Sequence, residues 1–142
     1  MSNRPEADAY IDTDVIIRLL TGDDPKKQAR AATLFDQVEK GAIRLAVPVL
    51  VIAEVVFVLS SPRLYHLPRT EVVGLLLPLL RLQNFTIQKR RTVFKALDLY
   101  LATSLSFTDA YIAASMQQVG PKAVYSYDRG YDRLEGIDRK EP

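Results

Sequence analysis

Acidic side chains follow two short apolar segments that the sequence predicts to be β-strands. Asp12 and Asp14 come directly after the first of these segments, and Asp128 ends the last of them. Ser126 lies two residues before Asp128, so both side chains point to the same side of that strand. In a parallel sheet, ligands bind beyond the carboxyl ends of the strands. The aspartates are therefore candidate ligands of a divalent cation, and Ser126 is a candidate hydrogen-bond partner of a metal-bound water or a ligand carboxylate. Each aspartate taken alone equally fits a turn or a helix cap.

Glu54 lies in a segment that is apolar on every side of its predicted helix. Its neighbours three and four residues away are all apolar: Leu50, Val51, Phe57 and Val58. We therefore expect a buried carboxylate, which costs free energy unless a metal ion or a cation such as Arg18 compensates the charge. Asp109 lies in the first turn of another predicted helix, where the helix dipole stabilises an anion and would by itself explain the residue.

The composition leaves carboxylates as the main source of chemistry. The chain has no Cys and a single His, His66, which excludes thiolate metal sites, disulfides and thiol nucleophiles. Its 17 Asp and Glu residues suit hard cations, Mg²⁺ or Mn²⁺. There are 19 Lys and Arg residues, and the resulting net charge of +2 is too small to indicate a nucleic-acid partner by itself.

Alternating strand and helix patterns surround these residues and predict an α/β fold. Strands are predicted at residues 9–11, 43–47, 85–87 and 123–127, with an edge strand at 136–139. Helices are predicted at residues 15–20, 25–40, 48–60, 71–82 and 93–101, followed by a last helix capped by Thr108. Gly74 and Pro78 should interrupt or kink the fourth helix. This order predicts a mainly parallel sheet packed against helices, in a single domain over residues 1–142.

Nothing in the sequence predicts export or membrane insertion. Residues 1–8 are polar and charged, unlike a signal peptide. The longest nearly apolar run, residues 45–59, is too short for a bilayer and contains Pro48 and Glu54. We therefore expect a soluble, cytoplasmic protein with no membrane partner.

Four segments, in order, resemble the motifs of PIN-domain ribonucleases, especially the VapC-type toxins of type II toxin–antitoxin systems. They are residues 12–20, 52–56, 107–114 and 126–134. The resemblance implies a three-layer α/β/α sandwich with a central, mainly parallel sheet. It also implies an acidic pocket that binds Mg²⁺ or Mn²⁺.

The same resemblance assigns roles to individual residues. Asp12, Glu54, Asp109 and Asp128 correspond to the metal-binding and catalytic acids, and Ser126 corresponds to the hydroxyl of the last motif. Asp14 stands where the family commonly has Asn, and adds charge near the metal. Gly130 stands where many members have a further Asp, which weakens the expectation of a second metal ion. Asp132 lies two residues further along the chain.

The implied activity is hydrolysis of RNA phosphodiester bonds, in which a bound cation lowers the pKa of its water. Arg18, Arg129 and Arg133 lie near the motifs and are candidate contacts of the RNA backbone. For a toxin, the resemblance implies a cognate antitoxin, from which an Arg would suit the acidic pocket. A homodimer is also expected. Its candidate surface consists of four leucines, for which packing in the core is the favoured interpretation: Leu75, Leu76, Leu79 and Leu80.

Two other interpretations fit part of the sequence. Asp12 and Asp14 after a strand match the Asp-x-Asp arrangement of haloacid-dehalogenase-type phosphatases, but that interpretation leaves Glu54 unexplained. The other alternative is a non-catalytic PIN-like module that binds RNA or a protein partner, and Gly130 gives it slight support. Assays of phosphomonoester and RNA hydrolysis distinguish the phosphatase from the nuclease. Metal titration distinguishes the nuclease from the non-catalytic module.

Overall fold

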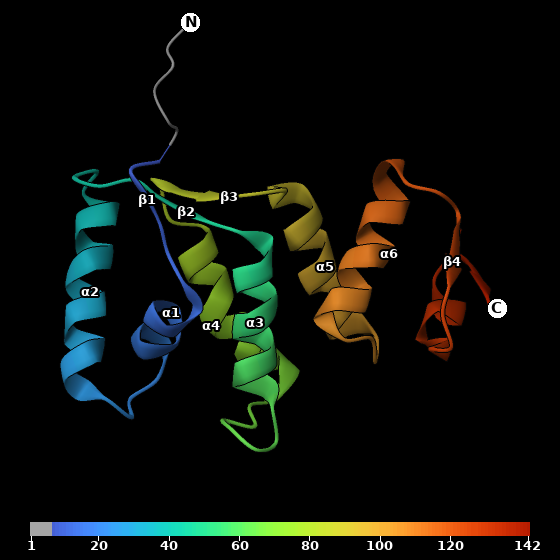
Figure 1. The fold of residues 1–142 in the computed structure, drawn as a ribbon, viewed down its shortest axis with the longest axis horizontal. Helices are drawn as coiled ribbons and strands as arrows, with labels where there is room; N and C mark the ends of the chain where they lie inside the picture. The colour runs from blue at the N-terminus through green and yellow to red at the C-terminus, as the bar shows by residue number, and fades with distance from the viewer. Residues whose placement is uncertain (1–6) are drawn as a thin grey trace, which may run out of the picture. The chain divides into compact units, whose positions relative to one another are not determined.

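The described chain forms two compact units. The computed structural model describes residues 7–142, so the expectation about the polar N-terminal segment lies largely outside the described residues. Their described residues are 7–88 and 89–142 (Figure 1). The expectation of a single domain stays a prediction. Within residues 7–142, no helix combines the length and apolar character needed to cross a lipid bilayer.

The N-terminal unit is built on a three-stranded parallel sheet. Its strands are β1 (Ala9–Tyr10), β2 (Leu45–Val47) and β3 (Phe85–Ile87), in the order β1-β2-β3. The first and last residues of β2 and β3 are buried, whereas Ala46 and Thr86, which lie between them, are half-buried. Because side chains alternate along a strand, one face of the sheet lies in the core.

Four helices complete this unit. They are α1 (Thr13–Leu20), α2 (Pro25–Glu39), α3 (Val49–Ser60) and α4 (Arg69–Leu80). α1 packs against α2 and α3, and α3 packs against α4. β1 leads into α1 and β2 leads into α3, so the carboxyl ends of two adjacent strands feed the helices that carry Asp12 and Glu54.

Local signals set both ends of α2 as predicted. Asp24 accepts a hydrogen bond from the backbone N–H of Lys27 at 3.1 Å, and Pro25 is the first helical residue. Gly41 follows the C-cap residue Lys40 with a φ of 79°, a left-handed conformation that favours glycine at the end of a helix.

α4 is not interrupted at its glycine and proline, because its buried face outweighs these helix breakers. The helix begins at Arg69 and continues to Leu80, with Gly74 and Pro78 inside it. Packing of an apolar face stabilises a helix more than intrinsic propensity does. That face includes three of the leucines proposed as a dimer surface, Leu76, Leu79 and Leu80, which are 1%, 5% and 0% exposed. These leucines belong to the core, and the proposed dimer surface is wrong.

The C-terminal unit contains a helix pair and a small parallel sheet. Helices α5 (Arg90–Ala102) and α6 (Phe107–Val119) pack against each other. Strand β4 (Ala123–Tyr125) pairs with β5 (Asp138–Lys140), and the 3₁₀ helix η1 (Arg129–Arg133) lies between them in the chain. An α/β fold with parallel strands flanked by helices is therefore confirmed.

Two predicted boundaries in this unit are wrong by a few residues. The cap of α6 is Ser106, whose Oγ accepts a hydrogen bond from the backbone N–H of Asp109 at 3.1 Å, and Thr108 lies inside the helix. β4 ends at Tyr125, so Asp128 lies in the loop beyond the strand and caps η1. In both places a side-chain hydrogen bond to the backbone fixes the boundary.

Candidate active site

Asp12 is the N-cap of α1. Its Oδ1 accepts a hydrogen bond from the backbone N–H of Thr13 at 2.7 Å, and its backbone is extended, with a φ of −100° and a ψ of 169°. The helix therefore begins two residues earlier than predicted, and Asp14 lies in its first turn rather than at the cap. The carboxylates of Asp12 and Asp14 are exposed at the positive end of the helix dipole.

Thr13 connects the start of α1 with the middle of α3. Its Oγ1 donates a hydrogen bond to Oε2 of Glu54 at 2.9 Å, across 41 residues of sequence. Thr13 is only 7% exposed, so its hydroxyl is fixed in place. The sequence analysis did not identify this residue, although a Thr between two aspartates at a helix start was a usable signal.

Glu54 is exposed, which corrects the expectation of a buried carboxylate. α3 is apolar all round, but only one side of it faces the core, through Ile52, Val55, Val56 and Leu59. Leu50 and Phe57, one turn before and after Glu54, are 82% and 66% exposed. An apolar sequence therefore did not imply burial at this position. The alternative partner is also wrong, because Arg18 forms its ion pair with Asp23, at 3.1 Å.

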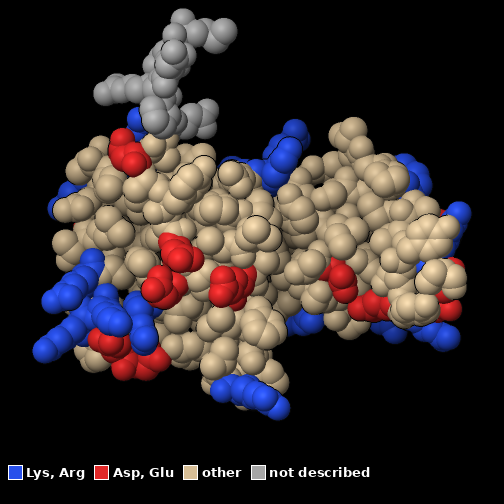
Figure 2. Space-filling view, viewed as in Figure 1, with Lys and Arg blue, Asp and Glu red and all other residues tan. Residues whose placement is uncertain are grey.

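These acids line one cavity of about 480 Å³ in the N-terminal unit. Asp12, Asp14 and Glu54 lie in its wall, together with Asp23 and Arg18. Figure 2 shows the corresponding gathering of acidic side chains over α1 and α3. The cavity thus brings together carboxylate oxygens of the kind that hard cations prefer.

Asp23 and Tyr65 belong to this cavity and were not predicted. The hydroxyl of Tyr65 donates to Oδ2 of Asp23 at 2.6 Å, and Thr21 Oγ1 donates to Oδ1 at 3.0 Å. These hydrogen bonds, with the charge of Arg18, hold the pKa of the Asp23 carboxyl below its usual value. Asp23 therefore stays ionised and fixes Arg18 at the edge of the cavity.

In the C-terminal unit, the charges of Asp109 and Asp128 both affect the pKa of Tyr131. Asp109 is half-buried in the first turn of α6, and Tyr131 of η1 is 1% exposed. The Tyr131 hydroxyl donates to the backbone carbonyl of Asp109 at 3.3 Å. Burial, followed by the charges of Asp109 and Asp128, raises the pKa of Tyr131. The phenol thus stays protonated and connects α6 to the loop that carries Asp128.

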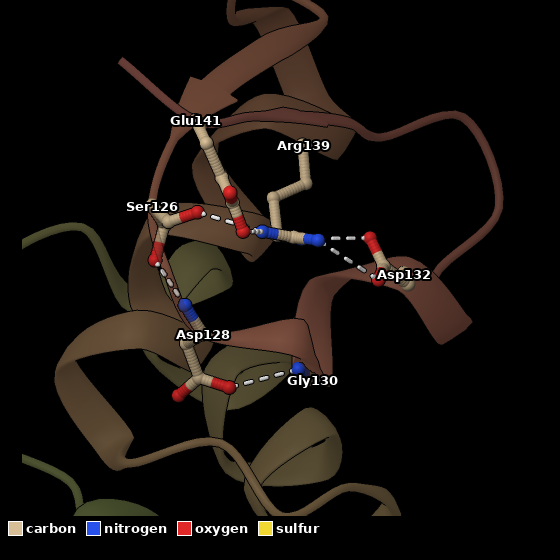
Figure 3. Close-up of polar contacts among 6 residues, drawn as sticks. All are labelled: Ser126, Asp128, Gly130, Asp132, Arg139 and Glu141. Atoms are coloured by element: carbon tan, nitrogen blue, oxygen red, sulfur yellow. Dashed lines mark hydrogen bonds and ion pairs between the residues drawn. The ribbon is translucent and has the colours of Figure 1, made fainter.

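Hydrogen bonds within the loop after β4 fix the orientation of Asp128 (Figure 3). Ser126 Oγ accepts from the backbone N–H of Asp128 at 3.0 Å, and Oδ1 of Asp128 accepts from the backbone N–H of Gly130 at 2.8 Å. A Cβ at position 130 would lie 2.7 Å from Leu105 Cδ2 and 3.0 Å from Asp128 Oδ1. Glycine therefore permits the close approach that orients Asp128.

Arg139 was not identified from the sequence and organises the far side of this loop. Its guanidinium donates to Oδ1 of Asp132 at 2.9 Å, to Glu141 at 2.8 Å and to the carbonyl of Ser126 at 3.0 Å (Figure 3). The hydrogen bond from Arg139 lowers the pKa of Asp132. Asp132 is therefore paired with Arg139. Arg129 and Arg133 of η1 are exposed.

The donor chemistry of both units fits a hard cation, although neither unit carries a complete ligand set. Carboxylate oxygens are the ligands that Mg²⁺ and Mn²⁺ prefer. Asp12 and Glu54 are joined through Thr13 in one unit, and Tyr131 hydrogen-bonds to the backbone of Asp109 in the other. Across residues 7–142, no three or more His, Cys, Asp or Glu side chains form a group that could hold a metal ion. A site made of all four acids is therefore a proposal.

Comparison with known proteins identifies the family. A search of curated proteins gives no match. Among solved structures, a toxin–antitoxin complex from Klebsiella pneumoniae is similar at 17% sequence identity and a TM-score of 0.31, over 91% of this chain and 93% of that chain. The sequence profile of the PIN domain matches residues 9–137, a stretch that contains the four acids and every element from β1 to η1. On that match, the chain belongs to the PIN domain family.

Proposed function

We propose that this protein is a metal-dependent endoribonuclease whose catalytic acids are Asp12, Glu54, Asp109 and Asp128. The observation that carries the proposal is the PIN domain match over residues 9–137, because PIN domains are generally nucleases. The match leaves the haloacid-dehalogenase interpretation without support. The acids also occupy helix starts and an exposed helix face, where a substrate can reach them.

The residues around the acids have positioning roles in this proposal. When bound, Mg²⁺ or Mn²⁺ would supply an activated water and stabilise negative charge on the phosphodiester. Thr13 orients the carboxylate of Glu54, and the Gly130 N–H orients that of Asp128. Tyr131 holds the first turn of α6, which carries Asp109. Asp14 adds negative charge beside Asp12, and Ser126 shapes the loop that presents Asp128.

Cations near the acids would hold the RNA backbone. Arg129 and Arg133 are exposed on η1, directly after Asp128. Arg18 lines the acidic cavity, where Asp23 fixes its guanidinium. Contacts of this kind add affinity without sequence preference and weaken as the salt concentration rises.

The catalytic assignment predicts that Asp12→Asn and Asp109→Asn each abolish cleavage of single-stranded RNA in the presence of Mn²⁺. Asn keeps the shape of the side chain but removes the charge that binds the cation. Matched controls are Asp36→Asn on α2 and Asp98→Asn on α5, two exposed aspartates outside the motifs. The measurement is cleavage of a labelled RNA by purified protein, with circular dichroism to confirm folding. Undiminished cleavage by the Asp12→Asn protein would contradict the proposal.

We further propose that the nuclease is a toxin, acts in the cytoplasm and is restrained by a cognate antitoxin. The acidic cavity suits an Arg side chain from such a partner. A small antitoxin gene directly upstream, whose product copurifies with this chain and relieves growth arrest caused by its expression, is the expected finding. Arrest that persists when the product is present would count against this pairing. A homodimer belongs to the same proposal, and sedimentation velocity would measure it.

A non-catalytic module is the second candidate, because the described residues contain no ready group of three metal ligands. It predicts that the purified protein binds no Mn²⁺ at millimolar concentration, whereas the nuclease proposal predicts binding. Calorimetric titration with Mn²⁺ separates the two.

A further inference from the structure

A second cavity lies between α1 and α2, outside the catalytic acids. Its volume is about 350 Å³, at the lower end of the range for small-molecule sites. Val15 of α1 and Ala31 and Leu34 of α2 form an apolar floor. All of these residues belong to the N-terminal unit, so the cavity is complete within it.

Cations line the α2 side of this cavity. Lys27 and Arg30 lie three residues apart, on the same face of the helix, and both are exposed. Neither side chain has an ion-pair partner among residues 7–142. Two neighbouring cations repel each other, and a bound anion would relieve that repulsion. The α2 rim is therefore suited to an anionic group.

Negative charge is confined to the opposite side of the cavity. Asp14 lies there on α1, and Arg18 beside it is already paired with Asp23. A ligand with one anionic end would therefore direct that end to Lys27 and Arg30 and its uncharged part towards α1. Asp14 can accept hydrogen bonds from amino groups of that uncharged part.

The α1–α2 cavity adjoins the acidic cavity, because Asp14 and Arg18 line both. Figure 2 shows basic side chains over the N-terminal half of α2, beside the acidic group over α1 and α3. A strand held at Asp12 and Glu54 can therefore reach the α1–α2 cavity.

We propose that the α1–α2 cavity binds one nucleotide of the RNA strand next to the cleaved phosphodiester. The base packs on Val15, Ala31 and Leu34, while Lys27 and Arg30 bind the phosphate, for which Arg offers a fork of donors and Lys a point charge. The RNA part rests on the proposed nuclease function. The occupant is a nucleotide rather than an acidic peptide, because the cavity combines a small apolar floor with two adjacent cations and an acceptor opposite them.

The direct test is methyl NMR of the full chain titrated with adenosine 5′-monophosphate in EDTA, which prevents metal-mediated binding at the acids. We expect the methyl signals of Val15, Ala31 and Leu34 to shift. Adenosine and inorganic phosphate, each carrying half of the ligand, should shift them less at equal concentration. The Lys27→Gln/Arg30→Gln double variant should bind the nucleotide about tenfold more weakly. Lys26→Gln, an exposed cation on the same turn that does not line the cavity, is the matched control.

RNA binding gives a second readout. In an Asp12→Asn background, the slope of log affinity against log salt for single-stranded RNA should fall by about 0.7 for each phosphate that the double variant no longer neutralises. Lys26→Gln should leave the slope unchanged.

The outcomes separate this proposal from the nuclease function. If the nucleotide shifts these methyl signals but the protein does not cleave RNA, the cavity is a nucleotide site and the nuclease proposal is contradicted. Cleavage with an unchanged KM in the double variant, together with no methyl shifts, overturns the cavity proposal and leaves the nuclease intact. Shifts caused by a Glu-rich amphipathic peptide but not by the nucleotide would make the cavity a protein-docking site and also overturn the proposal.

Discussion

At the scale of single residues, the hydrogen bond from Thr13 to Glu54 positions one of the proposed catalytic acids. Glu54 is exposed, so nothing in the core fixes its rotamer, and Thr13 Oγ1 is its side-chain partner at 2.9 Å. A flexible carboxylate loses rotamer freedom when it binds a cation, and a hydrogen bond already formed reduces that loss. Thr13 therefore belongs to the site although it bears no charge.

We expect Thr13→Val to lower Mn²⁺ affinity or cleavage by about 10–100-fold, the usual effect of removing a partner of a metal ligand. Val keeps the shape of Thr, so the buried position stays filled. Thr13→Ser retains the hydroxyl and should restore most of the activity. Calorimetry with Mn²⁺ and cleavage kinetics measure the two effects. Equal losses in the Val and Ser variants would show that packing, and not the hydroxyl, matters.

Gly130 lies where an added Cβ would come too close to Leu105 and Asp128. We expect Gly130→Ala to lower the free energy of unfolding by about 1–3 kcal/mol, because its Cβ would press on the buried Leu105 and on Asp128. The control is Gly74→Ala in α4, where nothing lies within 4 Å of an added Cβ. That change should stabilise the protein by about 0.4–1 kcal/mol. Urea unfolding measures both, and equal effects of the two substitutions would contradict the crowding at position 130.

At the scale of elements, the ends of helices and strands were predictable where the signal is local. The Asp24, Pro25 and Gly41 signals of α2 act within a few residues, and the observed ends agree with them. The cap of α6 was misplaced by two residues because Ser106 and Thr108 are both competent caps, and only the backbone conformation selects Ser106. Element type was therefore more predictable than element boundary.

Contacts between distant elements could not be predicted in the same way. The exposure of Glu54 depends on which side of α3 meets the core, and a helix that is apolar all round does not indicate that side. The Thr13–Glu54 bond spans 41 residues, and the Tyr131–Asp109 bond spans 22. The acidic residues were visible in the sequence because of their charge, whereas the neutral residues that position them were not.

The Arg139 cluster predicts a pH dependence for the pairing of β5 with η1. Because Arg139 lowers the pKa of Asp132 in the folded state, the pair contributes stability above the ordinary Asp pKa of about 3.9. That contribution is lost as the pH falls through the lower folded-state pKa. Asp132→Asn should therefore destabilise the protein at neutral pH, and the difference from wild type should shrink as the pH falls below about 3.9. Urea unfolding across this range measures it, and a difference independent of pH would contradict the role of Arg139.

At the scale of the whole molecule, the charge count fits separate roles for the acidic and the basic residues. If four of the 17 acids belong to the catalytic site, 13 remain against 19 Lys and Arg residues. The near-neutral total then combines an acidic site with a surplus of cations elsewhere, such as Lys27, Arg30, Arg129 and Arg133. A bound cation would reduce the repulsion between the acids and the RNA phosphates, while the other cations attract the strand.

The proposed metal-binding acids predict that Mn²⁺ stabilises the folded protein. Anything that binds the folded protein and not the unfolded chain stabilises it, by about 2.7 kcal/mol at a hundredfold excess over Kd. For a chain of this size each kcal/mol raises Tm by about 2–4 °C, so saturating Mn²⁺ should raise Tm by several degrees. Asp12→Asn and Asp109→Asn should each reduce that shift, because each removes a carboxylate proposed to bind the cation. An unchanged shift in either variant would exclude that aspartate from the metal-binding acids.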